Sequence, residues 1–326
     1  MNITQQLEAA TGWKFKELCI DDIHIYSNYI KKSNIPVNEW STSFPYLYAS
    51  SSYLTILWTI IDNMLVTFRF SKSKNQIHLQ CVPFGEGSPD HVVNVLYKCL
   101  MFCYTWNDKS NSHTKVSILN EAQLEFLQES NLFDKYFKFS YHKTRGRNVM
   151  ERHYSIKKLI SLSGKDFAYV RESINNFYRK NPGLIIRYYT PSDYDNLINL
   201  YNHWFKTTDE KYFYISDKIE YRQILKYYTQ LNQIILVAEI DGQIIGMIAG
   251  GELPNGQSWA SLRKTTNNGR GITQALVVKL AEEIHNLNPN IELLNDGTDD
   301  GQEGLIFVKE KFRPVLNLTL HSLYLK

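Results

Sequence analysis

The sequence predicts an α/β protein built from two domains that share one order of elements. Each half begins with a β-rich stretch that runs into a helical pattern, at residues 15–20 and again at residues 184–189. Each half later carries a short apolar strand that ends in Asn followed by an acid, at residues 116–121 and 291–296. Because the two copies lie so far apart in the chain, the self-similarity indicates a tandem of similar domains rather than a solenoid of short repeats.

Length and composition agree with two folded domains. The chain has 326 residues, of which 43% are hydrophobic and 21% are charged, as in ordinary globular proteins. This length suffices for two separate cores. The net charge of +3 permits an anionic ligand. It does not by itself indicate nucleic acid, because domains that bind nucleic acid usually have a strong basic stripe.

Cysteine usage and the apolar runs predict a cytoplasmic protein. We expect ordinary buried thiols in a reducing compartment, since no metal-ligand spacing is present among Cys19, Cys81, Cys99 and Cys103. Residues 1–8 lack the basic-then-apolar pattern of a signal peptide. The most apolar run, residues 54–70, is interrupted by Asp62 and Asn63, so it predicts a hairpin and not a membrane span.

The order of helices and strands can be predicted more clearly for the second half than for the first. Residues 234–240 and 243–249 are β-rich and flank Asp241-Gly242, which is a typical hairpin turn. Residues 191–193 supply a turn proline and a capping side chain before a helix. The full expectation is strand 184–189, helices 196–205 and 217–231, hairpin 234–249, strand 258–262, helix 272–286, strand 291–294, helix 303–312 and a final strand from residue 315.

The first half gives a similar series, and a helical segment connects the two. We expect strands at 54–60, 64–70 and 77–82, a helix at 89–106, a strand at 116–119, a helix at 121–130 and a strand at 137–141. The charged segment 146–182, with a helix at 167–179, is predicted to be a solvated connection. A surface that contacts phosphate is the competing interpretation of its basic residues. The predicted domains are therefore residues 1–145 and 183–326.

A glycine-bearing loop between a predicted strand and a predicted helix is the sharpest chemical signal. It would bring unpaired backbone N–H groups and the positive end of a helix dipole to one point, where a pyrophosphate is stabilised. A simple Asn-Asn-Gly turn is the alternative interpretation. The candidate donor-binding residues are Arg263, Lys264, Asn267, Asn268, Gly269, Arg270, Gly271, Ile272 and Thr273.

The corresponding loop of the first half has glycines but the opposite charge. Residues 83–90 carry Glu86 and Asp90 and have no Lys or Arg. Since these acids would repel a phosphate, we expect that the first domain does not bind the same anionic donor. It would instead supply one wall of a cleft.

An acidic loop near the end of the second half supplies the candidate catalytic residues, which are Asp296, Asp300 and Glu303. A carboxylate positioned there can accept a proton from an incoming amine when its pKa is raised. The same acids also suit turns and the N-cap of the helix that begins near residue 303, and this structural interpretation stays open for each of them. The spacing departs from the calcium-loop template, so we predict no metal site.

Aromatic side chains indicate where an acceptor would bind. His203 and Trp204 lie in a predicted helix, and Tyr212 and Tyr214 follow it; together they are the candidate substrate-binding residues. A histidine beside a tryptophan is also commonly a half-buried packing residue. Serine and cysteine have no recognisable partner motif in this sequence, so a covalent intermediate has no support.

The order of elements resembles the Gcn5-related N-acetyltransferase (GNAT) fold, in which a meander of three strands precedes the donor loop. This resemblance implies α+β domains with mixed central sheets flanked by helices. Nearly the whole chain resembles the C-terminal domain of phosphatidylglycerol lysyltransferases, tandem GNAT-like proteins akin to Fem-type acyltransferases. The residues that carry this resemblance are Asn295, Asp300, Gly301, Glu303, Gly304, Leu305, Lys309 and Pro314, together with residues 162–165, Arg171 and Phe177. The sequence departs from the family at Ile306, where relatives have Arg, and we expect no membrane-spanning portion.

The GNAT-like order of elements and the glycine-bearing loop together predict an acyltransferase that moves an acyl group from a thioester donor, acyl-CoA or an acyl carrier protein, to an amine in a cleft between the two domains. The donor would be a co-substrate, and no cofactor would be tightly bound. The amine would belong to a small molecule, a peptide or a lipid. Two alternatives stay open. One is an aminoacyl transferase that uses aminoacyl-tRNA, the donor that the family resemblance implies. The other is a non-catalytic ligand-binding or interaction module, which Thr266 and Ile306 favour.

Overall fold

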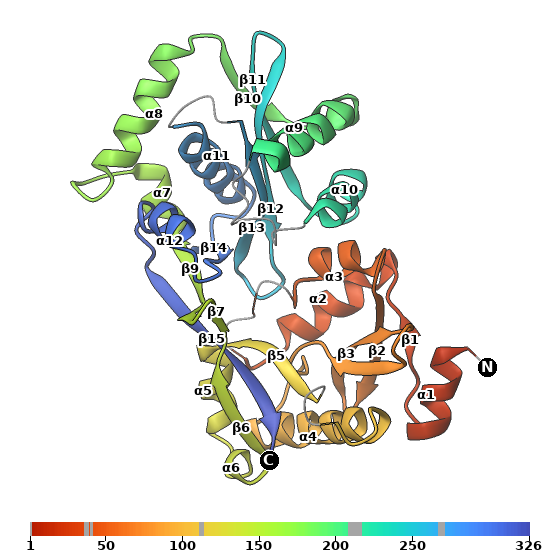
Figure 1. Ribbon diagram of the computed structural model, residues 1–326. Helices are drawn as coiled ribbons and strands as arrows, with labels where there is room; N and C mark the ends of the chain where they lie inside the picture. Colours follow the sequence, from red (N-terminus) through yellow and green to blue (C-terminus); the bar gives the residue numbers. More distant parts are fainter. Residues whose placement is uncertain (1, 36–38, 40–41, 111–113, 208–216, 267–270) are drawn as a thin grey trace. The chain divides into compact units, whose positions relative to one another are not determined.

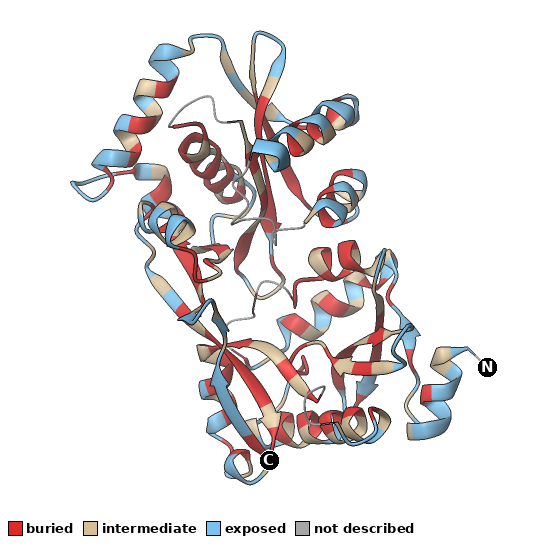
Figure 2. Cartoon of the chain, viewed as in Figure 1, coloured by how far each residue is buried: buried red, intermediate tan, exposed pale blue. Residues whose placement is uncertain are grey.

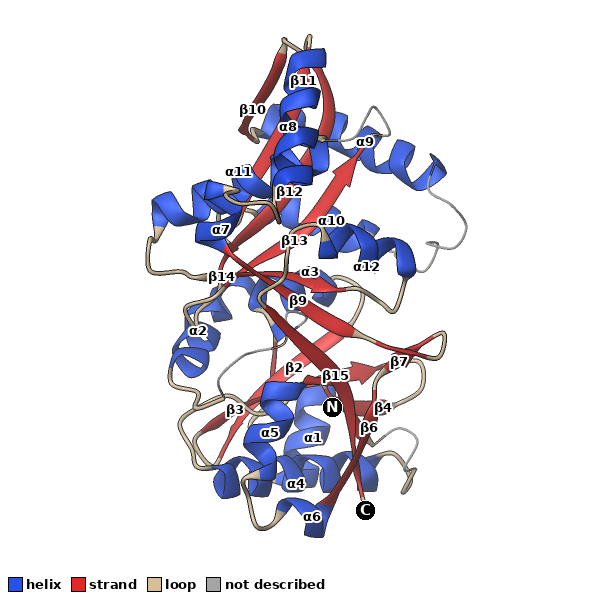
Figure 3. Ribbon diagram, turned by 90° about the vertical axis from the view of Figure 1, so that its left-hand side faces the viewer, coloured by secondary structure: helices blue, strands red, loops and turns tan. Residues whose placement is uncertain are grey.

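The computed structural model divides the chain into two compact units, each of which we describe by itself (Figure 1). The described residues are 2–35, 39, 42–110, 114–207, 217–266 and 271–326. Unit 1 comprises Met1–Glu151 and Leu318–Lys326, and unit 2 comprises Arg152–Asn317. Each unit mixes helices with strands, as Figure 3 shows.

Unit 1 contains a four-stranded antiparallel sheet with the order β1-β2-β3-β4. The β2–β3 hairpin turns at Asp62 and Asn63, which both have positive φ, as a type I′ turn requires. The strands of unit 1 are β1 (Lys16–Glu17), β2 (Thr55–Ile61), β3 (Met64–Ser71), β4 (Gln76–Leu79), β5 (Lys115–Asn120), β6 (Phe137–Tyr141), β7 (Lys143–Thr144) and β8 (Arg147–Asn148). The helices are α1 (Ile3–Thr11), η1 (Ile20–Asp22), α2 (Ile23–Lys31), α3 (Phe44–Ser51), α4 (Pro89–Trp106), α5 (Glu121–Gln128) and α6 (Phe133–Tyr136).

Helix α4 provides one side of the unit 1 core. The Ser88 hydroxyl accepts the backbone N–H of His91 at 3.3 Å, which caps the helix, and a proline at the first helical position suits its start. Cys99 and Cys103 are fully buried in this core, and burial raises the pKa of both thiols. Cys19, in contrast, is exposed, so the prediction of a buried thiol is wrong at that position, which lies in the turn before η1.

Unit 2 is built on a sheet with the order β10-β11-β12-β13-β14-β9. The β11–β12 hairpin turns at Asp241 and Gly242, both with positive φ, as the Asp-Gly sequence predicts. The strands are β9 (Met150–Ser155), β10 (Leu184–Tyr188), β11 (Ile234–Ile240), β12 (Gln243–Glu252), β13 (Ser258–Thr265) and β14 (Leu293–Thr298). The helices are α7 (Ile156–Ser161), α8 (Ala168–Lys180), η4 (Pro191–Asp193), α9 (Tyr194–Thr207), α10 (Lys218–Tyr227), α11 (Ile272–Leu287) and α12 (Glu303–Glu310).

Helices cover both faces of the unit 2 sheet. Helix α11 packs on one face with α7 and α8 beside it, and α9 packs on the other face (Figure 1). The sequences of strands that are covered on both faces are nearly continuous apolar runs. Strands β11 and β12 are of this kind, and they are buried along most of their length (Figure 2). The order of elements predicted for residues 184–312 is therefore present in this unit.

The structure divides the chain differently from the predicted boundaries. Helix α8 buries Val170, Ser173 and Phe177, and two of these join the apolar core of unit 2, so the segment 146–182 is not merely a solvated connection. The last strand, β15 (Leu316–Leu325), pairs antiparallel with β5 and β6 of unit 1. The apolar stripe of α8 assigns that helix to the core of unit 2, and the pairing with β5 and β6 assigns most of β15 to unit 1. Charge density indicates neither feature.

Across the described ranges, no helix combines the length and the apolar composition needed to cross a membrane.

Candidate functional site

The candidate site of unit 2 begins where two parallel strands stop pairing. Strands β13 and β14 pair through Ser258↔Leu294 and Trp259↔Asn295. Beyond these positions β13 continues to Thr265 and pairs on its other edge with β12. Among the described residues, the edge of β13 on the β14 side therefore has no strand partner over residues 260–265, and such an edge can bind an extended chain through its backbone groups.

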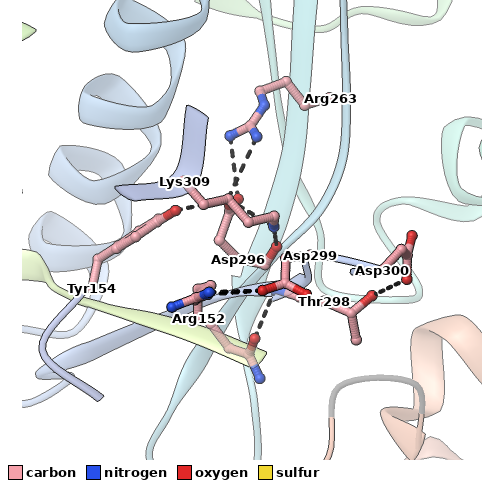
Figure 4. A network of polar contacts seen from close by, with 10 residues as sticks. Arg152, Tyr154, Arg263, Asp296, Thr298, Asp299, Asp300 and Lys309 are labelled. Atoms are coloured by element: carbon pink, nitrogen blue, oxygen red, sulfur yellow. Dashed lines mark hydrogen bonds and ion pairs between the residues drawn. The ribbon is translucent and has the colours of Figure 1, made fainter. Parts of the chain in front are cut away.

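A buried charge cluster lies beside this edge (Figure 4). We call Asp296, Arg263, Lys309 and Tyr154 the β14 cluster. The Asp296 carboxylate accepts hydrogen bonds from Arg263 Nη1 at 3.2 Å, from Lys309 Nζ at 3.0 Å and from the Tyr154 hydroxyl at 3.0 Å. Lys309 also donates to the Asp296 backbone carbonyl. One carboxylate therefore holds two cations from β13 and α12.

Electrostatics keep Asp296 ionised. Burial alone would raise the pKa of this carboxyl, but the charges of Arg263 and Lys309 and the hydrogen bonds that it accepts lower the pKa below its ordinary value. A general base that works near neutral pH needs a raised pKa, so the surroundings of Asp296 favour an anchoring role. Its predicted catalytic role stays a prediction that this geometry does not favour.

A second ion pair fixes the acidic loop on β9. Arg152 donates to Asp299 at 2.8 and 3.1 Å and to Glu310 at 2.9 Å, and its third acceptor is Asn317 Oδ1 at 3.0 Å. Asp299 Oδ1 also accepts the backbone N–H of Gly301 at 3.1 Å, which is a turn-forming bond. The loop between β14 and α12 is thus held by two buried carboxylates.

The other two candidate catalytic acids lie at the outer end of this loop. Asp300 has a positive φ of 49° and accepts the Thr298 hydroxyl at 2.6 Å (Figure 4). Glu303 is the exposed first residue of α12, where a negative charge complements the helix dipole. Both positions suit structure, as the sequence allowed, and a catalytic role for either stays a prediction.

Lys264 belongs to a different cluster. Because neighbouring residues of a strand point to opposite faces, Lys264 points away from Arg263 and meets Asp217, Tyr201 and Trp204. Its Nζ lies 2.6 Å from Asp217 Oδ2 and 4.1 Å from the Trp204 ring centroid, while the Tyr201 hydroxyl donates to Asp217 Oδ1 at 3.0 Å. Burial lowers the pKa of Lys264, and the Asp217 carboxylate opposes this shift.

These contacts bear on the predicted donor loop. Arg263 and Lys264 both use their charge inside the protein, and the side chain of Lys264 is only 5% exposed. Neither is a free phosphate ligand, although Arg263 keeps 19% of its side chain accessible. Four of the predicted donor residues lie outside the described part of the chain: Asn267, Asn268, Gly269 and Arg270.

The three remaining donor-loop residues have structural roles in unit 2. Ile272 is buried in the core, and the Thr273 hydroxyl lies 3.4 Å from that of Thr265. Gly271 is the N-cap of α11 with φ of 120°. A Cβ at that position would lie 2.3 Å from the Ser173 carbonyl oxygen and 2.6 Å from Phe177 Cβ. A glycine is therefore needed there because α8 approaches the backbone.

Replacing Gly271 by Ala is expected to lower the free energy of unfolding by about 2–3 kcal/mol, because the Cβ meets a backbone carbonyl and the φ is unfavourable for other residues. Urea unfolding would measure this change. Gly256→Ala is the matched control, since Gly256 also has positive φ but has no atom within 4 Å of the added Cβ. Equal losses for the two variants would contradict the role of α8.

The candidate acceptor residues are only partly described. Tyr212 and Tyr214 lie outside the described residues. Trp204 packs its ring over Lys264, which is the packing role that the sequence left open. His203 is exposed on α9 and lines a cavity of about 470 Å³. The other lining residues are Asn196, Asn199, Leu200, Gly242, Gln243, Ile244 and Thr266. An acceptor role for His203 stays a prediction.

Arg152, Tyr154 and Asp217 are site residues that sequence reasoning missed. The first two alternate along β9, in a segment that charge density alone assigned to a connection. Their spacing of two residues was the available signal, because it places both side chains on one face of a strand. Asp217 carried no local signal, since its partner lies far away in the sequence on β13.

His153 makes the stability of the fold dependent on pH. Burial, reinforced by the charge of Lys309, lowers its pKa to about 4, against an opposing effect of the Leu316 backbone. The unfolded chain takes up a proton as pH falls below about 6.5 while the folded chain does not, so stability is lost from that pH towards about 4. We expect the wild type to lose about 2 kcal/mol between pH 7 and pH 5.

Urea unfolding of the wild type and of His153→Leu at both pH values measures this contribution. The variant should lack the loss that His153 causes. An equal pH dependence in the two proteins would show that the proton uptake occurs elsewhere.

Comparison with known proteins places the chain in a family. The sequence model of the family described as "Phosphatidylglycerol lysyltransferase, C-terminal" matches residues 43–319. The chain belongs to this family. The match spans most of both units and confirms the resemblance predicted from the acidic loop. A search of curated proteins found no match.

Solved structures confirm the tandem GNAT-like fold. A conserved protein of unknown function from Bacteroides thetaiotaomicron has a TM-score of 0.80 at 20% identity, covering 96% of this chain and 100% of that one. The C-terminal domain of a protein named as a putative lysylphosphatidylglycerol synthetase, from Agrobacterium fabrum, has a TM-score of 0.59 at 11% identity, covering 94% and 91%. A tandem GNAT protein from the clavulanic acid biosynthesis pathway has a TM-score of 0.50 at 8% identity, covering 96% and 98%. At these identities the likeness concerns the fold.

Proposed function

We propose that this protein is an aminoacyltransferase that takes an aminoacyl group from aminoacyl-tRNA and passes it to an amine or a hydroxyl acceptor. The name of the family supports an aminoacyl group as the cargo. The thioester donor expected from the sequence has less support, because Arg263 and Lys264 are paired with carboxylates inside the protein. The charges of these two donor-loop residues are thus already used inside the protein, and Arg270 lies outside the described residues.

The observation that carries the proposal is the unpaired edge of β13, within the described residues, beside the β14 cluster. An aminoacyl group can lie along this edge and form backbone hydrogen bonds, as a peptide does when it adds to a sheet. Arg263 is the cation of the cluster that remains accessible. Because two cations share the single charge of Asp296, Arg263 can also stabilise the negative charge that develops on an acyl carbonyl oxygen.

The proposed reaction exchanges one acyl bond for another. The acceptor nitrogen or oxygen attacks the carbonyl carbon of the aminoacyl ester, and the new bond forms as the ester bond to the RNA ribose breaks. The acceptor proton ends on the released ribose hydroxyl. Positioning of acceptor and ester, together with stabilisation of the oxyanion, supplies the rate acceleration. No step requires a covalent enzyme intermediate.

Transfer from acyl-CoA is the second candidate. Acetyl-CoA is named for the tandem GNAT protein of the clavulanic acid pathway, whose structure was solved without it, and the fold of that protein resembles this chain over most of its length. In addition, α11 follows a glycine-bearing segment, and a helix N-terminus favours a phosphate. This candidate differs from the first in its donor and shares the acyl chemistry.

Calorimetric titration distinguishes the two donors. The probes are acetyl-CoA, a long-chain acyl-CoA and an aminoacyl-tRNA mimic whose amino acid is joined to the RNA by a stable amide. We expect micromolar binding of the mimic, weaker binding of the same RNA without its amino acid, and no saturable binding of either CoA ester. Saturable binding of a CoA ester without binding of the mimic would overturn the proposal in favour of the second candidate.

A further inference from the structure

Unit 1 contains a basic pocket of its own, lined by none of the residues of the site in unit 2. The pocket has a volume of about 610 Å³ and opens where β2 begins and where the β3–β4 hairpin turns. Arg69, Lys72 and Lys74 line it, and no Asp or Glu is among its lining residues. The other lining residues are Tyr53, Leu54, Thr55, Phe70, Ser71, Ser73, Gln76 and His78.

The three cations of this pocket have no carboxylate partner within the part of the chain that the structure describes. By contrast, Lys98 of α4 is paired at 2.5 Å with Asp62, which lies in the turn at the other end of the β2–β3 hairpin. Arg69 is half-buried on β3, opposite His78 of β4. Like charges around a concavity repel one another and concentrate an anion between them. The pocket is therefore suited to a ligand that carries several negative charges.

Other features of the pocket favour a nucleotide strand. Hydroxyl groups of Ser71, Ser73 and Thr55 can donate to phosphate oxygens between the cations. Tyr53 is 50% exposed, and an accessible aromatic ring beside basic side chains provides a platform for a base. A lipid surface would instead favour exposed basic and apolar side chains on a protruding face, and this site is a hollow.

We propose that the basic pocket of unit 1 binds RNA, with Arg69, Lys72 and Lys74 on consecutive phosphates and Tyr53 against a base. The proposal rests on the proposed function, since the RNA would belong to the aminoacyl-tRNA donor. It departs from the expectation that the first domain does not bind the same anionic donor, which rested on the acidic loop at residues 83–90. That loop lies outside the lining of the pocket.

The test measures the affinity of the full chain for deacylated tRNA by fluorescence anisotropy over a series of salt concentrations. The variants are Lys72→Glu with Lys74→Glu, and Arg69→Gln. The matched control is Lys31→Glu with Lys32→Glu, which makes the same charge change at exposed positions of unit 1 that do not line the pocket. Thermal unfolding verifies that each variant is folded.

We expect the Lys72 and Lys74 double variant to weaken binding by at least about tenfold. It should also reduce the slope of log affinity against log salt by about 1.4–1.8, since each of the two lost phosphate contacts removes about 0.7–0.9. Arg69→Gln should reduce the slope by about 1. The control should keep most of the affinity. Equal weakening in both double variants would overturn the proposal, because it would reflect net charge alone.

Two further probes exclude other sources of negative charge. The proposal would be overturned in favour of a lipid headgroup if the protein bound vesicles of phosphatidylglycerol and phosphatidylcholine through the pocket and did not bind RNA. Inorganic phosphate that binds while RNA does not would overturn it as well. The deacylated RNA also separates this inference from the proposed function. If the pocket variants bind RNA normally and the protein still transfers the aminoacyl group, only the pocket proposal is refuted. If RNA binding depends on the pocket but no transfer occurs, only the proposed function is refuted.

Discussion

Replacing Asp296 by Asn is expected to lower the free energy of unfolding by about 3–5 kcal/mol, because the change leaves the buried Lys309 and the partly buried Arg263 without their counter-charge. The side chain of Asp296 is 3% exposed, and that of Lys309 is 6% exposed. Water therefore cannot replace the lost carboxylate. Urea unfolding followed by circular dichroism measures the loss as a shift of the midpoint at an unchanged slope.

Two controls separate this electrostatic effect from a general sensitivity of the region. Glu292→Gln removes a charge from an exposed carboxylate just before β14 and should change stability by less than about 0.5 kcal/mol. Adding Lys309→Met to Asp296→Asn removes one of the stranded cations and should recover part of the loss. The role of Asp296 as counter-charge would be contradicted if the loss of stability in the double variant equalled the sum of the losses in Asp296→Asn and Lys309→Met.

Replacing Arg263 by Met is expected to lower the rate of aminoacyl transfer by about 10²–10³, the effect of removing one donor from an oxyanion site. Arg263 lies on the unpaired edge of β13 and is the accessible cation of the β14 cluster. Asp296 keeps its hydrogen bonds from Lys309 and Tyr154 in this variant. The stability loss should consequently be smaller than that of Asp296→Asn. Steady-state measurement of kcat and KM for the donor tests the prediction.

The loss should fall on kcat more than on KM, because an oxyanion forms only in the transition state. Lys279→Met is the matched control: it removes an accessible cation that pairs with Glu282 and Glu283 on α11. It should transfer at the wild-type rate. A purely structural role for Arg263 would be indicated if the rate fell only in proportion to the folded fraction.

The fold of unit 2 could be predicted closely from local patterns. Turn chemistry at Asp241-Gly242 and the helix start at residues 191–193 are signals within a few residues, and the structure has a hairpin and η4 there. The boundaries between units depend on partners far away in the sequence. Residues 318–325 of β15 lie in unit 1, where β5 and β6 pair with them, and no local pattern reports which strands will pair.

The location of the site could be predicted from the sequence, but the partners of its charged side chains could not. The sequence identified Arg263 and Lys264 through the glycine-bearing loop that follows them, and Asp296 through the acidic loop. It assigned the two cations to a phosphate, since their carboxylate partners were not evident. Asp217 stands 47 residues before Lys264, and such a pairing follows only from the sheet geometry. The same limit hid the basic pocket of unit 1, whose residues come from two separate stretches of chain.

The most direct test of the central claim is a transfer assay with aminoacyl-tRNA that carries a radioactive amino acid. The purified protein would be incubated with this donor and with either phosphatidylglycerol micelles or a small primary amine as acceptor. The account predicts that label leaves the RNA and appears in one of these acceptors, with wild type and Lys279→Met equally active and Arg263→Met about 10²–10³ slower. The account would be contradicted if the RNA kept its label while acetyl-CoA, supplied in place of the tRNA, released free CoA.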